Sequence, residues 1–236
     1  MQLFYESQLD PGLSVFTFSK EESRHILKVL RKKTGDIVFI TNGRGYLFEC
    51  EIDTPLGLLC KVKILKETFT PPHPKEVHLA VCPTKHSDRY EWFLEKVTEI
   101  GLSSLTPIRA SRSERKEINT ERLKKIVQSA MKQSLRTHLP RVHETIVLSD
   151  FLKLDFEGNK LIAHCGKSPK YQMKQAISPD KNTLILIGPE GDFSDEEIKM
   201  ALDNGFKPVT LGNQRLRTET AALMACVLTN SVYDLF

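Results

Sequence analysis

The pattern of apolar and polar positions in the first part of the chain favours short strands. Ile37–Thr41 and Tyr46–Ile52 are rich in β-branched and aromatic residues, and they flank Asn42-Gly43-Arg44-Gly45, whose glycines permit positive φ. This combination predicts a β-hairpin. Leu59–Leu65 alternates apolar residues with lysines, which predicts a further strand with one face in solvent. We therefore expect a small β-rich domain over residues 1–70.

Within this domain, Glu21–Arg31 has helical spacing instead. Its apolar side consists of Ile26, Leu27 and Leu30, and its basic side of Arg24, Lys28 and Arg31. A helix with one basic side is suited to contact the phosphates of a nucleic acid. We therefore predict that these three basic residues contact phosphates.

A cluster of prolines indicates a domain boundary. Thr70-Pro71-Pro72-His73-Pro74 cannot continue a helix or a central strand, because proline restricts φ and lacks an amide donor. After it, strand and helix patterns alternate, with strands over Val77–Cys82 and Ser104–Ile108 and helices over Tyr90–Ile100 and Glu121–Arg136. This alternation predicts a layered α/β domain over residues 75–236.

The C-terminal part of the chain continues the alternation with short apolar runs, which are typical of buried parallel strands. These runs are Leu161–His164, Thr183–Ile187 and Pro208–Leu211. Ser194 and Glu197 have the spacing of a capping box that begins one helix, and Thr218–Leu235 predicts another. Since ligands of open α/β sheets bind beyond the carboxyl ends of the strands, we expect a site in the loops that follow these runs.

Two of these loops have residues suited to a nucleotide-like ligand. Gly188-Pro189-Glu190-Gly191 has the preferences of a type I turn, and its glycines let backbone amides and carbonyls approach a flat group such as adenine. Leu186 and Ile187 supply an apolar wall. In the second loop, Arg217 precedes a helix that Thr218 is predicted to cap, and it is placed to bind a phosphate or a developing oxyanion.

Composition excludes several classes of protein. Hydrophobic residues make up 40% of the 236 positions and charged residues 27%, as in globular proteins. No apolar run approaches the roughly 20 residues that span a bilayer, and Met1–Leu13 lacks the pattern of an export signal. We expect a cytoplasmic protein without a membrane segment.

The cysteines and histidines do not have the spacing of a metal site. The five cysteines are odd in number, lack C-x-x-C spacing and lie in apolar segments, so we expect buried, reduced thiols. The histidines have no cysteine or carboxylate partner at ligand spacing. We therefore expect no metal.

The net charge of +4 is concentrated in one segment. Residues 109–141 contain ten Lys and Arg against three Glu, a net charge of +7, whereas residues 142–236 carry a net charge of −3. Such a concentration favours binding to a phosphate backbone, and a solvated helix face is the alternative. The candidate RNA contacts in this segment are Arg112, Arg115 and Arg136.

Several motifs together resemble a known family. Gly188–Gly191 is followed by Leu211-Gly212 and by Leu216-Arg217-Thr218-Glu219-Thr220-Ala221, and this combination is similar to the signature of the SPOUT methyltransferases of the RsmE type. Further matches are His25–Arg31 with Gly35-Asp36, Lys85, Arg89, Glu91, Lys96–Gly101, Gln133-Ser134, Arg136 and Pro140. The chain departs from the pattern at Gln214-Arg215, where many members have Arg-Ile.

This resemblance implies a fold, a cofactor and a substrate. Members use S-adenosylmethionine to methylate N3 of a uridine, position 1498 of 16S rRNA in the small ribosomal subunit. The implied fold is an N-terminal PUA-like β-barrel that binds RNA and a C-terminal SPOUT α/β domain with a trefoil knot, in a homodimer. The residues expected to hold the cofactor are Leu186, Ile187, Gly188, Pro189, Glu190, Gly191, Leu211, Gly212, Leu216, Thr218, Ala221 and His164.

Uridine N3 must lose a proton before it can be methylated. We predict that Arg217 stabilises the resulting uracil anion, with Glu219 as a further catalytic candidate. Three groups are candidates for the general base that accepts this proton: Glu190, Glu219 and a hydroxide ion from solvent. Two alternative functions are a SPOUT enzyme that methylates a ribose 2′-hydroxyl or a transfer RNA, and a ribosome-assembly factor that binds RNA without catalysis.

Overall fold

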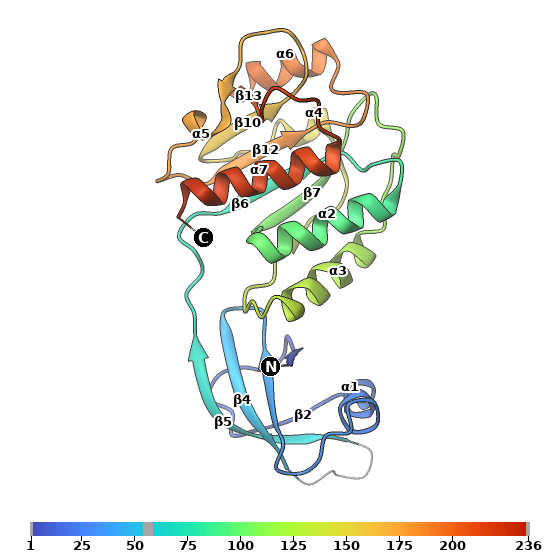
Figure 1. Ribbon diagram of the computed structural model, residues 1–236, viewed down its shortest axis with the longest axis vertical. Helices are drawn as coiled ribbons and strands as arrows, with labels where there is room; N and C mark the ends of the chain where they lie inside the picture. Colours follow the sequence, from blue (N-terminus) through green and yellow to red (C-terminus); the bar gives the residue numbers. More distant parts are fainter. Residues whose placement is uncertain (1, 54–58, 235–236) are drawn as a thin grey trace. The chain divides into compact units, whose positions relative to one another are not determined.

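The computed structural model describes residues 2–53 and 59–234, which form two compact units (Figure 1). The first unit consists of Met1–Pro72 together with Met131–Leu139. The second consists of His73–Ala130 and Pro140–Phe236. The first unit therefore includes a segment that no pattern in the sequence assigned to it.

The first unit contains a five-stranded sheet. Its strands are β1 (Leu3–Tyr5), β2 (Val15–Thr17), β3 (Ile37–Thr41), β4 (Tyr46–Ile52) and β5 (Lys61–Phe69), in the order β1-β3-β4-β5-β2. The β1–β3 pair is parallel and the other pairs are antiparallel. The predicted hairpin is confirmed at its predicted bounds, and Gly43 and Gly45 in its turn have φ of 73° and 96°. Phe18, Ile26 and Phe48 lie in the core beneath this sheet.

The helix predicted over Glu21–Arg31 differs from the one observed. Helix α1 spans Lys20–Arg24 and is followed by a π-helical turn, η1, over His25–Val29. The backbone amide of Leu30 bonds to the carbonyl of His25 at 2.9 Å, a wider spacing than that of an α-helix. Arg31 lies beyond the helix with φ of 54°, so the predicted end was wrong. Arg24, Lys28 and Arg31 are nevertheless all exposed.

Met131–Leu139 joins the first unit through backbone hydrogen bonds. The amide of Gly45 donates to the carbonyl of Thr137, and the amide of Leu139 donates to the carbonyl of Gly43, both at 2.9 Å. Backbone bonds of this kind depend little on side-chain identity. A hydrophobic pattern therefore could not have assigned this segment.

The second unit is built on a wholly parallel sheet. Its strands are β6 (Val77–Val81), β7 (Ser104–Arg109), β8 (Arg141–Val142), β9 (Ile146–Val147), β10 (Asn159–Ala163), β11 (Tyr171–Gln172), β12 (Thr183–Ile187) and β13 (Lys207–Thr210). The order is β11-β13-β10-β12-β6-β7-β8, with β9 also paired to β7. The parallel α/β architecture predicted from the sequence is confirmed.

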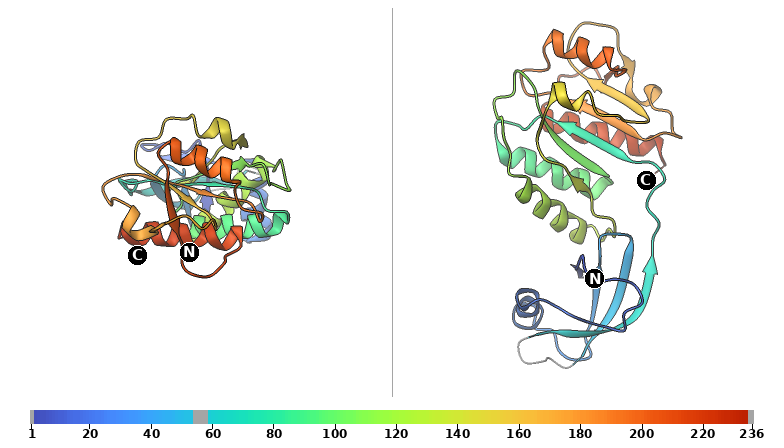
Figure 2. Two further views of the ribbon diagram at one scale, coloured as in Figure 1. Left: turned by 90° about the horizontal axis from the view of Figure 1, so that it is seen from above. Right: turned by 180° about the vertical axis from the view of Figure 1, so that it is seen from behind.

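Helices cover both faces of this sheet (Figure 2). The helices α2 and α7 pack together on one face, and α4 and α6 lie on the other. The helices that follow α1 and η1 among the described residues are α2 (Ser87–Ile100), α3 (Thr120–Gln133), α4 (Leu148–Phe151), α5 (Met173–Ala176), α6 (Asp195–Asp203) and α7 (Thr218–Val232). The capping box of Ser194 and Glu197 is present at the start of α6. The predicted last helix ends at Val232, and Leu235 lies outside the described residues.

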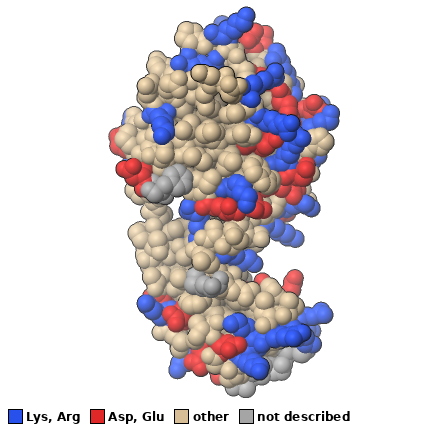
Figure 3. Space-filling view, viewed as in Figure 1, with Lys and Arg blue, Asp and Glu red and all other residues tan. Residues whose placement is uncertain are grey.

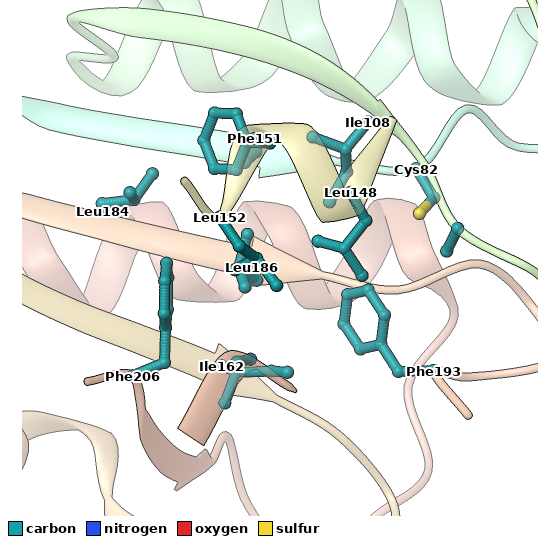
Figure 4. Close-up of a cluster of buried hydrophobic side chains, with 13 residues drawn as sticks. Cys82, Ile108, Leu148, Phe151, Leu152, Ile162, Leu184, Leu186, Phe193 and Phe206 are labelled. Carbon is teal, nitrogen blue, oxygen red and sulfur yellow. The ribbon is translucent and has the colours of Figure 1, made fainter. Parts of the chain in front are cut away.

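A hydrophobic cluster fills the space between the sheet and the helices α4 and α6 (Figure 4). Leu184 and Leu186 of β12 point into it together with Phe151, Phe193 and Phe206. Burial of such side chains contributes on the order of 1.5–3 kcal/mol each. Because β12 is packed on both faces, the chain that leaves its carboxyl end at Ile187 starts from a rigid position.

Candidate functional site

A cavity of about 690 Å³ opens at the carboxyl edge of three neighbouring strands. Strand β10 lies between β12 and β13, and all three run parallel, so the loops that follow them meet at one edge. The cavity is lined by parts of these loops and by the first turn of α7. The topology thus brings together three segments that are about 20 or more residues apart in sequence.

Most residues predicted to hold the cofactor line this cavity. They are His164, Ile187, Gly188, Pro189, Glu190, Leu211, Gly212, Leu216, Thr218 and Ala221, and Arg217 lines it as well. Two predicted residues do not: Leu186 is fully buried in the hydrophobic cluster, and Gly191 is exposed with its carbonyl accepting a bond from Arg112 at 3.1 Å. Cys165, Lys170 and Asp192, which no sequence pattern indicated, also line the cavity.

The turn predicted over Gly188–Gly191 is displaced by one residue. The amide of Asp192 donates to the carbonyl of Pro189 at 2.9 Å, so Pro189 and not Gly188 begins the turn. The carbonyl of Gly188 instead accepts a bond from the hydroxyl of Thr218 at 3.0 Å. A Cβ atom at Gly188 would lie 3.1 Å from the ring of Phe193, so glycine lets the loop pack closely on the core.

Thr218 does not cap α7 as predicted. The N-cap residue is Arg217, and no side-chain bond caps the helix. The Thr218 hydroxyl is buried and donates to Gly188, which leaves it unavailable to the helix amides. This hydrogen bond joins the two glycine-containing loops that the sequence singled out.

We predict that Thr218→Val lowers the free energy of unfolding by about 1–3 kcal/mol, because a buried carbonyl loses its donor. Valine keeps the shape of threonine, so the change removes the bond alone. Urea titration measures the effect, and Thr68→Val, at an exposed position of β5, is the control. Equal stability of the Thr218→Val protein and the wild type would contradict this role.

Two carboxylates brace the loops around the cavity. Glu190 Oε1 accepts a bond from the backbone amide of Lys85 at 2.9 Å. Asp192 Oδ2 accepts one from the amide of Cys165 at 2.8 Å, and Asp192 has φ of 61°. The loop after β12 is therefore tied both to the loop after β6 and to the loop after β10.

Cys165 departs from the prediction of buried thiols. It is exposed and lines the cavity, whereas Cys50, Cys60, Cys82 and Cys226 are buried and all five are free. It lies two residues beyond the end of β10, where the chain leaves the core. Burial raises the pKa of the Cys82 thiol to about 12, which keeps that thiol protonated.

His164 lines the cavity and has one buried ring nitrogen without a hydrogen-bond partner among the described residues. Its Nδ1 accepts a bond from the amide of Gly166 at 3.2 Å, while its Nε2 is buried without a partner among the described residues. Burial lowers the pKa of His164, the charge of Lys170 lowers it further, and Asp192 opposes them. A neutral imidazole whose Nδ1 accepts must carry its proton on Nε2.

Glu219 is buried beside the cavity and faces a cation. It is 7% exposed, and its Oε1 lies 3.9 Å from Nη1 of Arg89. This ion pair connects the first turn of α7 to the first turn of α2. Glu219 does not line the cavity at the carboxyl edge of β10, β12 and β13, and its ion pair with Arg89 favours a positioning role for it.

Several basic residues of segment 109–141 already form hydrogen bonds or ion pairs within the protein. Arg112 donates to the carbonyls of Gly191 and Phe193, and Arg115 donates to the carbonyl of Lys85. Ion pairs involve Arg122 with Glu91, Lys124 with Glu121, and Arg141 with Glu76. On the face drawn in Figure 3, lysine and arginine side chains lie among acidic ones. Arg112, Arg115 and Arg136 as RNA contacts stay a prediction.

Among the described residues, no group of three or more His, Cys, Asp or Glu side chains could hold a metal ion. Within the same residues, no helix combines the length and the apolar character that crossing a membrane requires.

Family models match nearly the whole chain. An RNA methyltransferase domain model matches residues 71–230, and an RNA methyltransferase PUA domain model matches residues 18–66. The ribosomal RNA small subunit methyltransferase E of Buchnera aphidicola subsp. Acyrthosiphon pisum is 30% identical over 246 aligned positions, covering 100% of this chain and 94% of the relative. The Bacillus subtilis protein of that name is 29% identical and covers 89% of this chain and 87% of its own length.

Solved structures share the fold over the full length. A structure described as a probable rRNA-methyltransferase from Porphyromonas gingivalis has a TM-score of 0.91 at 37% identity, covering 100% of this chain and 99% of that one. The ribosomal RNA small subunit methyltransferase E of Neisseria gonorrhoeae, bound to S-adenosylmethionine, has a TM-score of 0.87 at 27% identity and covers 99% and 98%.

Proposed function

The chain belongs to the RNA methyltransferase family, and we propose that it transfers a methyl group from S-adenosylmethionine to N3 of a uridine in 16S ribosomal RNA. Family membership confirms the resemblance that the Gly188 and Leu216 motifs predicted. The uridine and its reacting atom are proposals, supported by that resemblance and by the arrangement of the site.

The convergence of three loops on one cavity is the observation that carries this proposal. The cavity fits the proposed cofactor in kind: Ile187, Leu211 and Leu216 offer apolar contacts to an adenine ring, and Gly188 lines it as well. The buried Nε2–H of His164 is a donor that needs an acceptor, and a polar group of the cofactor would supply it. The neighbouring structure from Neisseria gonorrhoeae contains this cofactor.

When bound, S-adenosylmethionine supplies a methyl group that its sulfonium already activates. The protein's task is to align the uridine, to exclude water and to favour the uracil anion that remains after N3 loses its proton. Arg217 is exposed and lines the cavity, and its guanidinium has no hydrogen-bond acceptor within the described residues. It is thus free to face the uracil oxygens.

The proton acceptor is open among three groups. Glu219 is buried against Arg89, which favours a positioning role for it. Glu190 lines the cavity but holds the Lys85 amide with one oxygen. A hydroxide ion from solvent is the third candidate.

We extend the proposal to the RNA and the assembly. The first unit, with its PUA domain match, binds the RNA of the small ribosomal subunit through Arg24, Lys28 and Arg31. The enzyme acts in the cytoplasm as a homodimer, and the second unit is knotted, as the resemblance implies. Light scattering of the purified protein tests the dimer.

We predict that RNA affinity falls by about tenfold or more between 50 and 200 mM salt, because each phosphate contact releases counterions. The triple change Arg24→Gln, Lys28→Gln and Arg31→Gln should make the logarithmic salt slope shallower by about 2. The charge-matched control replaces the exposed residues Lys174, Lys199 and Lys207 of the second unit with glutamine. An equal salt slope in the two triple variants would show that Arg24, Lys28 and Arg31 do not contact the RNA phosphates.

Transfer of a labelled methyl group tests the proposed function. Labelled S-adenosylmethionine is incubated with the protein and with 16S rRNA, either naked or assembled in small subunits, and transfer RNA serves as the alternative substrate. The proposal expects label in 16S rRNA alone. Calorimetric binding of the cofactor without transfer to any RNA would favour a non-catalytic assembly factor.

A further inference from the structure

A second hollow of about 690 Å³ adjoins the cofactor cavity. The two share Arg215, Leu216 and Arg217, which stand between them. The rest of the second hollow comes from the first two turns of α2, including Arg89 and Trp92, and from the first turn of α7. These helices pack side by side (Figure 1), so the hollow has a rigid floor.

Trp92 gives this hollow an aromatic wall. It is the single tryptophan of the chain and is 47% exposed. A large aromatic side chain that is half exposed inside a hollow offers a flat face for a ligand ring. Base–aromatic stacking is a contact through which proteins bind single-stranded nucleic acids.

Cations surround the aromatic wall. Arg215 and Arg217 are exposed, and neither guanidinium has a hydrogen-bond acceptor within the described residues. Nη1 of Arg89 lies 3.9 Å from the buried carboxylate of Glu219, and both residues line the hollow. An indole face beside unpaired guanidinium groups matches a nucleotide, which has a ring to stack and a phosphate to pair.

We propose that this hollow, the Trp92 groove, holds the reacting nucleotide of the RNA substrate. The base stacks on the indole of Trp92, its edge faces Arg217 next to the cofactor cavity, and Arg215 binds a flanking phosphate. The inference rests on the proposed function and adds the residues that hold the substrate base. It also gives a place to Arg215, which departs from the family pattern.

Tryptophan emission reports directly on the groove, because Trp92 is its only source in this chain. The full-length protein, saturated with S-adenosylhomocysteine, is titrated with an oligouridylate of about eight nucleotides. We expect saturable quenching. An abasic oligomer of equal length can make the same phosphate contacts but has no base to stack on Trp92. It should therefore leave the emission unchanged.

Kinetics of two variants separate stacking from folding. Trp92→Leu removes the aromatic face and should raise KM for RNA about tenfold with cofactor Kd unchanged, whereas Trp92→Phe should keep KM within about threefold of the wild type. Tyr171→Leu, at an exposed aromatic of β11 outside both hollows, is the matched control.

Two results would overturn the proposal. One is emission that oligouridylate does not change, with a wild-type KM for Trp92→Leu. The other combines two observations: acrylamide does not quench Trp92 emission in the free protein, and Trp92→Leu dissociates a dimer. The groove would then be an interface between two copies of the chain. A wild type that transfers no methyl group to RNA would refute the proposed function instead, and quenching by the oligomer would still be measurable.

Discussion

Replacing Arg217 with alanine should slow methyl transfer by about 100- to 1000-fold, the usual cost of losing one donor aimed at a developing negative charge. Cofactor affinity should stay near the wild-type value. Arg217 lines both the cofactor cavity and the Trp92 groove, so its guanidinium stands where the two ligands meet. On this loop, Arg215 and Arg217 are the two exposed arginines that line both hollows.

The Arg217→Ala change leaves the local fold in place. The contribution of residue 217 to α7 is made by its backbone, whose carbonyl accepts the amide of Ala221 at 2.7 Å. Arg217→Lys keeps the positive charge but lacks the planar guanidinium. Its rate of methyl transfer should lie between those of the wild type and Arg217→Ala. Single-turnover rates at saturating cofactor measure the chemical step. A wild-type rate in Arg217→Ala with normal cofactor binding would show that the electrostatic role is wrong.

Replacing His164 with asparagine should weaken S-adenosylmethionine binding by about 10- to 100-fold, the effect of losing a buried hydrogen bond to the ligand. Asparagine Oδ1 takes the place of Nδ1 and keeps the bond from Gly166, but no donor remains at the Nε2 position. The His164→Gln change is the matched control, because its amide nitrogen reaches that position. It should retain most of the affinity.

Calorimetry of the two His164 variants measures this difference. Titration with 5′-methylthioadenosine, which lacks the amino acid part of the cofactor, shows which part the imidazole contacts. If the variants lose the same factor for both ligands, His164 contacts the nucleoside part. Equal affinity of His164→Asn and wild type for both ligands would contradict a donor role.

The parallel sheet and the position of the site followed from local patterns. Thr183–Ile187 was predicted at its observed bounds because a strand packed on both faces has a continuous apolar run. The carboxyl ends of such strands then indicate the ligand edge without further information. The neighbouring positions of β10, β12 and β13 could not be derived, because strand order depends on long-range packing.

Contacts between distant segments account for the parts that sequence patterns missed. Thr218 has the residue type of a helix cap, yet its hydroxyl reaches Gly188, 30 residues away. Asp192 was not singled out because its role is to hold a backbone amide. The π-helical turn at His25–Val29 was missed because its spacing is close to that of an α-helix over a single turn.

Analysis of nucleosides by mass spectrometry tests the central claim most directly. Small subunits that lack the modification are incubated with the protein and S-adenosylmethionine, and their 16S rRNA is digested. The account predicts N3-methyluridine at a single site with the wild-type protein, and none over the same time with Arg217→Ala. A methyl group on a ribose 2′-hydroxyl, or RNA binding with no methyl transfer, would contradict it.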